Sequence, residues 1–227
     1  SNLWERPIYW AVTCREDRLL GLNDYLQLEG LAVRIVPVKS KSESQAYGMV
    51  GMGRVDTDKA FDNIMNKWKW GNFDNHPTFI DRSYMPSLQT MRVSFIRVGR
   101  QLVTEGKKDK AIALADKYFE VFPKYNFPYD QFSSFMADIY ARAGAKDKAA
   151  EKINDIATSM EQQMQFYRSL PLDMQNGYQQ DMNFTMSTMQ SIMRITSDMG
   201  DSTLLDNLEN RFMPLMPQQP GLPGVVQ

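Results

Sequence analysis

Apolar side chains recur with a helical period through the second half of the chain, from residue 87 to residue 212. They return at positions i, i+3, i+4 and i+7, so each segment would form a helix with one apolar face. Glycine and proline residues interrupt this periodicity and mark the predicted helix ends. The pattern predicts six helices, at residues 87–105, 109–122, 129–143, 147–170, 174–199 and 203–212.

An internal repeat indicates that these helices pair as antiparallel hairpins. Residues 106–111 read GKKDKA and residues 144–149 read GAKDKA, so five of six positions agree. The two segments lie 38 residues apart, against roughly 34 for a tetratricopeptide unit. The longer loop at residues 123–130 accounts for the difference. The repeat therefore predicts tetratricopeptide-like hairpins, with a degenerate third hairpin at the C-terminal end.

The repeat also carries the residue sizes that such hairpins need. Small residues are expected where neighbouring helices cross closely, a large residue before the turn, and a glycine in the turn itself. A proline just past a helix stops its continuation. The matching positions are Gly99 and Ala137 as small residues before the turns, Leu102 and Tyr140 as large residues, Gly106 and Gly144 in the turns, Ala111 and Ala149 as small residues after them, and Pro123 at the end of the first unit.

The first 80 residues follow a different pattern, with short runs of β-branched and aromatic residues. Such runs at residues 7–13 and 31–38 predict two strands. Between them, Asn23 is expected to cap a short helix that ends at Gly30. The two strands could then pair in parallel or antiparallel. We therefore expect a small α/β element at the N-terminal end.

The expected fold class is mainly α, with tetratricopeptide-like hairpins of about six helices preceded by this α/β element. A helix that starts at Asp56 or Thr57 belongs to the N-terminal element. The carboxylates of Asp56 and Asp58 could bind a metal ion, but we favour a place in the first turn of this helix, where the helix dipole favours negative charge. Residues 71–86 read as an ordered connector. The predicted division is residues 1–80 for the element, 81–213 for the helical repeat domain, and 214–227 for a flexible Pro-rich tail.

The net charge and the hydropathy of the chain argue against a nucleic-acid partner and against a transmembrane segment. The chain has 26 Lys and Arg residues against 27 Asp and Glu residues, a net charge of -1, so we expect no nucleic-acid partner. The longest apolar run, residues 8–14, is far shorter than the roughly 20 residues of a transmembrane helix, so we expect no transmembrane segment here. The chain begins Ser-Asn-Leu without the pattern of a signal peptide, and we interpret it as part of a longer protein.

Few residues could support catalysis or bind a metal. His76 is the only histidine and Cys14 the only cysteine, so a zinc site or a His-activated nucleophile would lack partners. We predict His76 in a surface turn and Cys14 as a buried structural thiol. Gly48, Gly51 and Gly53 do not have the order of a dinucleotide-binding loop, and a flexible or extended loop is predicted there. We therefore expect no catalytic residue, no cofactor and no metal in this segment.

Two aromatic segments are candidate contacts for a partner. Trp68 and Trp70 alternate with lysines in the sequence KWKWGN; they could stack on a sugar or lie on an acidic lipid surface, or they could pack in the core, which we favour. Tyr129 and Asp130 lie in the loop between the repeats, where Asp130 could cap the next helix and Tyr129 could contact a partner. Seven methionines between residues 164 and 199 could line a peptide groove or, as we favour, fill space between hairpins.

Several short motifs resemble one protein family. They are RPIYWAVT at residues 6–13, GLNDY at 21–25, LEGLA at 28–32, DNIMNKWKWG at 62–71 and PYD at 128–130. In this order they resemble the soluble C-terminal region of a bacterial domain-of-unknown-function family of multi-pass membrane proteins related to protein O-mannosyltransferases. The resemblance covers about the first 150 residues. Trp10 and Val33 stand where the family pattern has Phe and Tyr.

The resemblance implies a periplasmic domain on the outer side of the inner membrane, attached to a glycosyltransferase-like membrane body. The carboxylates that would act in such a body lie near its first transmembrane helices, so no catalytic residue is carried over to this chain. We expect a non-catalytic interaction domain for a protein or peptide partner, or for its own membrane domain. The alternative is a carbohydrate-binding accessory module that uses Trp68, Trp70 and Tyr129.

Overall fold

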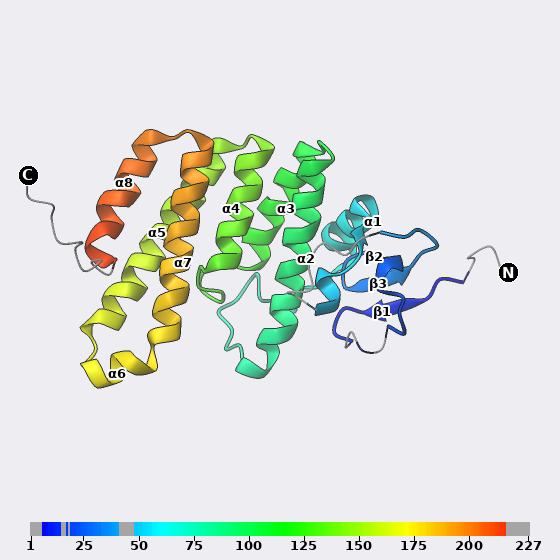
Figure 1. Ribbon diagram of the computed structural model, residues 1–227, viewed down its shortest axis with the longest axis horizontal. Coiled ribbons are helices and arrows are strands. Elements are labelled where there is room, and N and C mark those ends of the chain that lie inside the picture. Colours follow the sequence, from blue (N-terminus) through cyan, green and yellow to red (C-terminus); the bar gives the residue numbers. More distant parts are fainter. Residues whose placement is uncertain (1–5, 15–16, 18, 41–47, 217–227) are drawn as a thin grey trace, which may run out of the picture. The chain divides into compact units, whose positions relative to one another are not determined.

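The computed structural model describes residues 6–14, 17, 19–40 and 48–216. Its described part is mainly helical with a small sheet at the N-terminal end, as predicted (Figure 1). The strands are β1 (Tyr9–Ala11), β2 (Leu26–Leu28), β3 (Ala32–Ile35) and β4 (Arg54–Val55). The α-helices are α1 (Thr57–Asp62), α2 (Met85–Thr104), α3 (Lys108–Val121), α4 (Gln131–Ala143), α5 (Lys146–Ser169), α6 (Leu172–Gly177), α7 (Gln179–Met199) and α8 (Ser202–Phe212).

The chain forms two compact units. The first comprises residues 1–128 and 135–145, and the second comprises residues 129–134 and 146–227. The sheet, α1, α2 and α3 therefore belong to one unit, together with most of α4. The predicted boundary between residues 80 and 81 lies inside this first unit, and whether the two predicted parts fold separately stays a prediction.

The sheet has the order β1-β3-β2-β4, and its centre corrects one sequence prediction. The segment that we expected to be helical after Asn23 contains only a 3₁₀ turn, Asn23–Tyr25, and continues as β2. All three residues of β2 are buried, and the strand pairs antiparallel with β3 and parallel with β4. Partners on both edges outweigh the weak local helix preference. Gly30, with φ +117°, starts the tight β2–β3 loop instead of ending a helix.

Cys14 is exposed, so the predicted buried thiol is wrong. Strand β1 ends at Ala11, and the Cys14 amide donates to the Ala11 carbonyl oxygen at 2.9 Å. This turn carries the chain away from the sheet before Cys14. The apolar run that precedes the cysteine therefore does not extend its burial to position 14.

The helix predicted to start at Asp56 or Thr57 is confirmed. Asp56 caps α1, because its carboxylate accepts a hydrogen bond from the Lys59 amide at 3.1 Å. The helix continues as a π-helical turn, Asn63–Lys67, which buries Ile64 completely. The pair Asp56 and Asp58 thus lies at a helix start, where the helix dipole favours negative charge.

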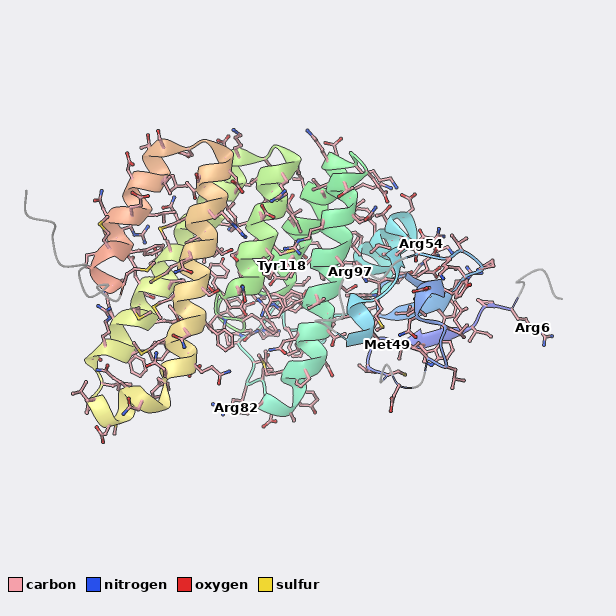
Figure 2. The ribbon with its side chains drawn as sticks, in the orientation of Figure 1. Arg6, Met49, Arg54, Arg82, Arg97 and Tyr118 are labelled. Atoms are coloured by element: carbon pink, nitrogen blue, oxygen red, sulfur yellow. The ribbon has the colours of Figure 1, made fainter. Side chains whose placement is uncertain are left out.

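The glycine-rich segment before α1 is held by an arginine from α2. Residues Gly48–Gly51 form a 3₁₀ turn rather than a purely extended loop. The Arg97 guanidinium donates to the carbonyl oxygens of Val50, Met52 and Gly53 at 2.7, 2.8 and 2.6 Å. Arg97 is labelled beside this segment in Figure 2. These charge-assisted bonds fix the loop against the helical part of the same unit.

The predicted repeat positions occupy helix turns and close crossings. Gly106 and Gly144 have φ +74° and +92° and end α2 and α4 in the left-handed conformation that favours glycine. Gly99 lies where α2 meets α4, since a Cβ atom there would come within 2.5 Å of the Ile139 side chain. Ala111, Ala137, Tyr140 and Ala149 are all buried, and Pro123 follows the end of α3.

The second unit contains α5, α6, α7 and α8. The single helix predicted at residues 174–199 is in fact two helices, because the chain breaks at Tyr178 (φ -103°, ψ 11°). The Tyr178 ring stacks on Tyr167 of α5 at a centroid distance of 5.4 Å, so a contact with another helix accompanies the break. Met164 and Met189 are fully buried, as expected of methionines that fill space, whereas Met174 is 55% exposed.

Candidate functional site

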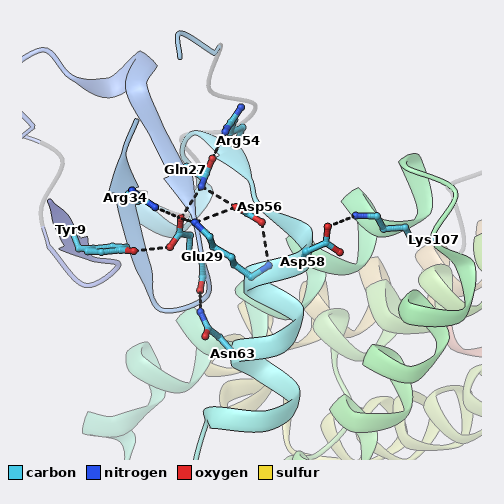
Figure 3. A network of polar contacts seen from close by, with 10 residues as sticks. Tyr9, Gln27, Glu29, Arg34, Arg54, Asp56, Asp58, Asn63 and Lys107 are labelled. Atoms are coloured by element: carbon cyan, nitrogen blue, oxygen red, sulfur yellow. Dashed lines mark hydrogen bonds and ion pairs between the residues drawn. The ribbon is translucent and has the colours of Figure 1, made fainter. Parts of the chain in front are cut away.

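A polar network surrounds Glu29 at the end of β2 (Figure 3). The carboxylate is almost fully buried. It accepts hydrogen bonds from the Tyr9 hydroxyl at 2.8 Å, the Gln27 amide at 2.7 Å and the Lys59 ammonium at 3.0 Å. The Arg34 guanidinium lies 3.8 Å away. Strands β1, β2 and β3 and helix α1 thus contribute to one cluster, which links the sheet to the helix.

The ionised form of Glu29 is favoured in this cluster. Burial alone would raise the pKa of this carboxyl group, but hydrogen bonds from Lys59, Tyr9 and Gln27 outweigh burial and hold the pKa below its usual value. Two effects raise the pKa of Tyr9: its hydroxyl is partly buried, and it donates a hydrogen bond to the Glu29 carboxylate. Tyr9 therefore remains a donor at neutral pH. The network therefore acts as a structural clamp.

This pKa shift predicts an acid-sensitive contribution to stability. Because the pKa of Glu29 is lower in the folded state, its contribution is fully present above the unfolded pKa of about 4.3 and is lost as the pH falls through the folded value. We expect Glu29→Gln to lower the free energy of unfolding by about 2 kcal/mol at pH 7. The difference should shrink below pH 4 in urea titrations. A difference that is independent of pH would contradict the assignment.

A polar cleft of about 500 Å³ lies next to this network, within the first unit. One wall consists of residues near β4 and the start of α1, and the other consists of residues of α2 and the turn after it. The first wall includes Arg54 and Asp58, and the second includes Arg97, Gln101 and Lys107. Cations, carboxylates and amides alternate around the cleft, so it presents both donors and acceptors.

Three charged groups of the cleft, Lys107, Asp58 and Glu105, are paired with one another. Lys107 forms ion pairs with Asp58 at 3.0 Å and with Glu105 at 2.9 Å, and the Thr57 hydroxyl donates to Glu105 at 2.6 Å. Hydrogen bonds from Lys110 and Lys107 lower the pKa of Asp58, and the hydrogen bonds that Lys107 donates to Glu105 and Asp58 raise the pKa of Lys107. These groups therefore stay ionised at neutral pH.

A second cavity, of about 390 Å³, contains the two candidate tryptophans. Trp68 and Trp70 are half-buried, with ring centroids 5.7 Å apart and planes inclined by 57°. Both rings pack on Phe95, and Trp70 also contacts Phe122 of the α3 terminus. One side of each indole packs on Phe95, as the core-packing interpretation predicts. Both residues also line the cavity, together with Asn66.

The outer wall of this second cavity is the connector that follows Trp70. Asn126 holds it, because its amide group donates to the carbonyl oxygens of Phe73 and His76 at 2.7 Å each and accepts from the Thr78 amide at 2.7 Å. The connector is therefore ordered, as predicted. His76 is exposed, which confirms the predicted surface turn.

Asn126 is expected to be a positioning residue for this wall. Asn126→Ala removes three hydrogen bonds to the connector, and we expect it to lower the free energy of unfolding by about 2 kcal/mol. The amide of Thr78 should also exchange its hydrogen faster. Lys124→Ala, an exposed change in the same loop, is the control. Unchanged exchange at Thr78 would show that the connector is held by other contacts.

The other two candidate contacts lie in the second unit. Tyr129 is buried, and burial raises the pKa of its hydroxyl. Asp130 caps α4 as predicted, since its carboxylate accepts from the Ser133 amide at 3.2 Å. The structure brings Trp68 and Trp70 together, but it gives Tyr129 little surface with which to meet a ligand.

Sequence reasoning missed the residues that hold these sites. Glu29, Arg97 and Asn126 were not candidates, because each depends on partners that lie at least 20 residues away in the sequence. One local signal existed for Glu29. Gln27 and Glu29 alternate with Leu26 and Leu28, which is the period of a strand and would have placed the two polar residues on one face.

In residues 6–14, 17, 19–40 and 48–216, no group of three or more His, Cys, Asp or Glu side chains is arranged to hold a metal ion. None of the helices in these same ranges is both long and apolar enough to cross a membrane.

The family model described as TMEM260-associated domain 2 matches residues 1–59, about a quarter of the chain. The matched segment includes all four strands and three of the motifs that carry the family resemblance. No curated protein and no solved structure matches the sequence. For this segment the match supports a link to a glycosyltransferase-like membrane protein family, whereas the relation to bacterial protein O-mannosyltransferases stays a prediction.

Proposed function

We propose that this chain is a non-catalytic interaction domain of a membrane glycosyltransferase-like protein, and that its polar cleft receives a segment of polypeptide. One observation carries the proposal. The cleft is built jointly by the segment that matches the family model, which includes Arg54 and Asp58, and by the first helical hairpin, which includes Gln101 and Lys107. A site made by both parts explains why the sheet and the hairpin occur together.

The chemistry of the cleft suits a polypeptide better than a small apolar ligand. Its walls carry amides and both signs of charge, which can form hydrogen bonds with the backbone amide and carbonyl groups of a polypeptide. The ion pairs of Lys107 balance the local charge, which argues against a strongly acidic or basic partner. The partner in this proposal is a loop of the protein's own membrane domain or a segment of an acceptor protein.

Site-specific photo-cross-linking tests this proposal. A photoreactive amino acid at Gln101, inside the cleft, should produce a discrete adduct with one polypeptide in a cell-envelope preparation. The same group at Lys108, which is exposed nearby but does not line the cleft, is the control. Equal adduct yields at the two positions, or none at either, would refute binding in the cleft.

We also propose that the domain lies on the periplasmic side of the inner membrane. The exposed Cys14, the only cysteine of this chain, allows a direct test. A membrane-impermeant maleimide should label it in cells whose outer membrane alone is permeabilised, and Cys14→Ala should remove the label from the peptides of this segment. Labelling that requires disruption of the inner membrane would place the domain in the cytoplasm.

A second candidate function is that of a carbohydrate-binding accessory module. The observation in its favour is the cavity lined by Trp68, Trp70 and Asn66. Aromatic rings with convergent amides are typical of sites that bind polar ligands with apolar faces. The buried position of Tyr129 removes that residue from this proposal.

A further inference from the structure

The second cavity has fixed aromatic walls. Phe95 packs on Trp68 edge to face at 6.0 Å and on Trp70 at 5.8 Å, while Phe122 packs on Trp70 at 6.1 Å. These contacts lie on the core side of the indoles and hold their orientation. The rings thus meet a ligand without first losing side-chain freedom, which favours binding.

The remaining walls of this cavity are rich in carboxamides. Asn66, Asn72 and Asn75 all line it, and each carboxamide offers two donor hydrogens and an acceptor oxygen. Asn66 donates to Asp62 at 2.8 Å and Asn75 donates to Asp74 at 3.2 Å. Each of these amides therefore keeps an acceptor oxygen to offer a hydroxyl group. Sugar hydroxyls, which both donate and accept, match this set.

The charges around the cavity are balanced. Lys69 and Lys117 line it together with Asp74. Lys117 forms an ion pair with Glu120 at 2.8 Å, which leaves the charges of Lys69 and Asp74 to offset each other. A phosphorylated or carboxylated ligand would find no excess of positive charge. The site therefore favours an uncharged ligand.

The connector forms one wall of the cavity, which is open to solvent. The Tyr125 hydroxyl donates to the Asp74 carbonyl oxygen at 2.8 Å, and Asn126 binds the neighbouring carbonyl oxygens of Phe73 and His76. Residues of the loop between α3 and α4 thus hold Asn72 and Asn75 in place around the indoles. A volume of about 390 Å³ lies near the lower end of the range for small-ligand pockets.

We propose that this cavity binds a neutral hexose unit of a glycan, whose apolar ring face lies on the indoles and whose hydroxyls bond to the asparagine amides. The inference deepens the second candidate function and is independent of the polar cleft. It assigns the sugar to Trp68, Trp70 and Asn66, and it gives Asn126 the role of positioning the opposite wall.

The test is a titration of the ¹⁵N-labelled 227-residue chain with methyl glycosides of glucose, mannose and galactose, followed by NMR. The indole N–H signals of Trp68 and Trp70 should shift saturably, while that of Trp10 should not. Because Trp68→Ala also removes core packing, the informative variant is Asn66→Ala, which loses only the bond to Asp62 in the described structure. It should weaken binding about three- to tenfold.

Asn183→Ala, an exposed change on α7, is the matched control and should leave the affinity unchanged. Glucuronic acid and glucose 6-phosphate form the charged arm of the titration. The proposal is overturned if no neutral glycoside shifts the two indoles, if only charged sugars do so, or if Asn66→Ala has no effect. Any of these results leaves the cross-linking at Gln101 unaffected, so a failure here is distinct from a failure of the polar cleft.

Discussion

Phe95→Ala should lower the free energy of unfolding by about 3–5 kcal/mol, the usual range for a fully buried phenylalanine. The Phe95 side chain has no exposed surface and meets four aromatic rings, those of Trp68, Trp70, Tyr118 and Phe122, at centroid distances of 5.6 to 6.0 Å. Each such pair adds about 0.5–1.5 kcal/mol beyond burial. Since domains are stable by only about 5–15 kcal/mol, this loss is a large fraction of the total.

Urea unfolding followed by tryptophan fluorescence measures this effect, because two of the four rings are tryptophans. Phe184→Ala is the control, since Phe184 is 57% exposed on α7 and its loss should change the free energy of unfolding by less than about 0.5 kcal/mol. Phe95→Leu should give an intermediate loss of about 1.5 kcal/mol. If Phe95→Ala matched the Phe184→Ala control, the aromatic cluster would not be the core of this unit.

The helical part of the fold could be predicted from local signals. Helices α2, α3, α4, α5 and α8 begin and end within two residues of the predicted positions. Their ends are marked by residues that act locally, such as Gly106 and Gly144 with positive φ and Asp201, which caps α8 through the Leu204 amide. Amphipathic periodicity predicted the helical segments between these ends, because each helix buries one face.

The errors occurred where a distant segment decides the local structure. Residues 26–28 became a strand because β3 pairs with one edge and β4, about 27 residues later, pairs with the other. The break at Tyr178 lies where its ring stacks on Tyr167 of α5, and Cys14 is exposed because β1 already ends at Ala11. None of these partners can be found from periodicity, which reports only the neighbours of a residue along one element.

In the candidate site, too, some residues could be predicted from local sequence and others could not. Trp68 and Trp70 were identified because cations and indoles alternate in the sequence, and the structure places both at one cavity. The groups that shape that cavity, Phe95 on the core side and Asn126 on the connector, come from elements later in the chain. Sequence patterns can therefore nominate the side chains that meet a ligand, but not those that hold them.

Gly53→Ala should destabilise the chain far more than Gly106→Ala, although both glycines have similar positive φ values of +68° and +74°. A Cβ atom at Gly106 would meet no other atom within 4 Å. Its substitution should therefore carry only the conformational penalty of a left-handed alanine, about 1–2 kcal/mol. A Cβ atom at Gly53 would in addition collide with the backbone carbonyl group of Leu26 on β2.

That collision cannot be relieved by rotating a side chain, because the opposing atoms are backbone at the centre of the sheet. The loop cannot simply move away either, since Arg97 holds the carbonyl oxygens of Val50, Met52 and Gly53. We expect Gly53→Ala to lower the free energy of unfolding by about 3–4 kcal/mol, the sum of the left-handed penalty and overpacking. Parallel urea titrations of the two variants give the difference directly. Equal losses at the two positions would mean that the glycine-rich segment and β2 do not approach as closely in solution as the structure places them.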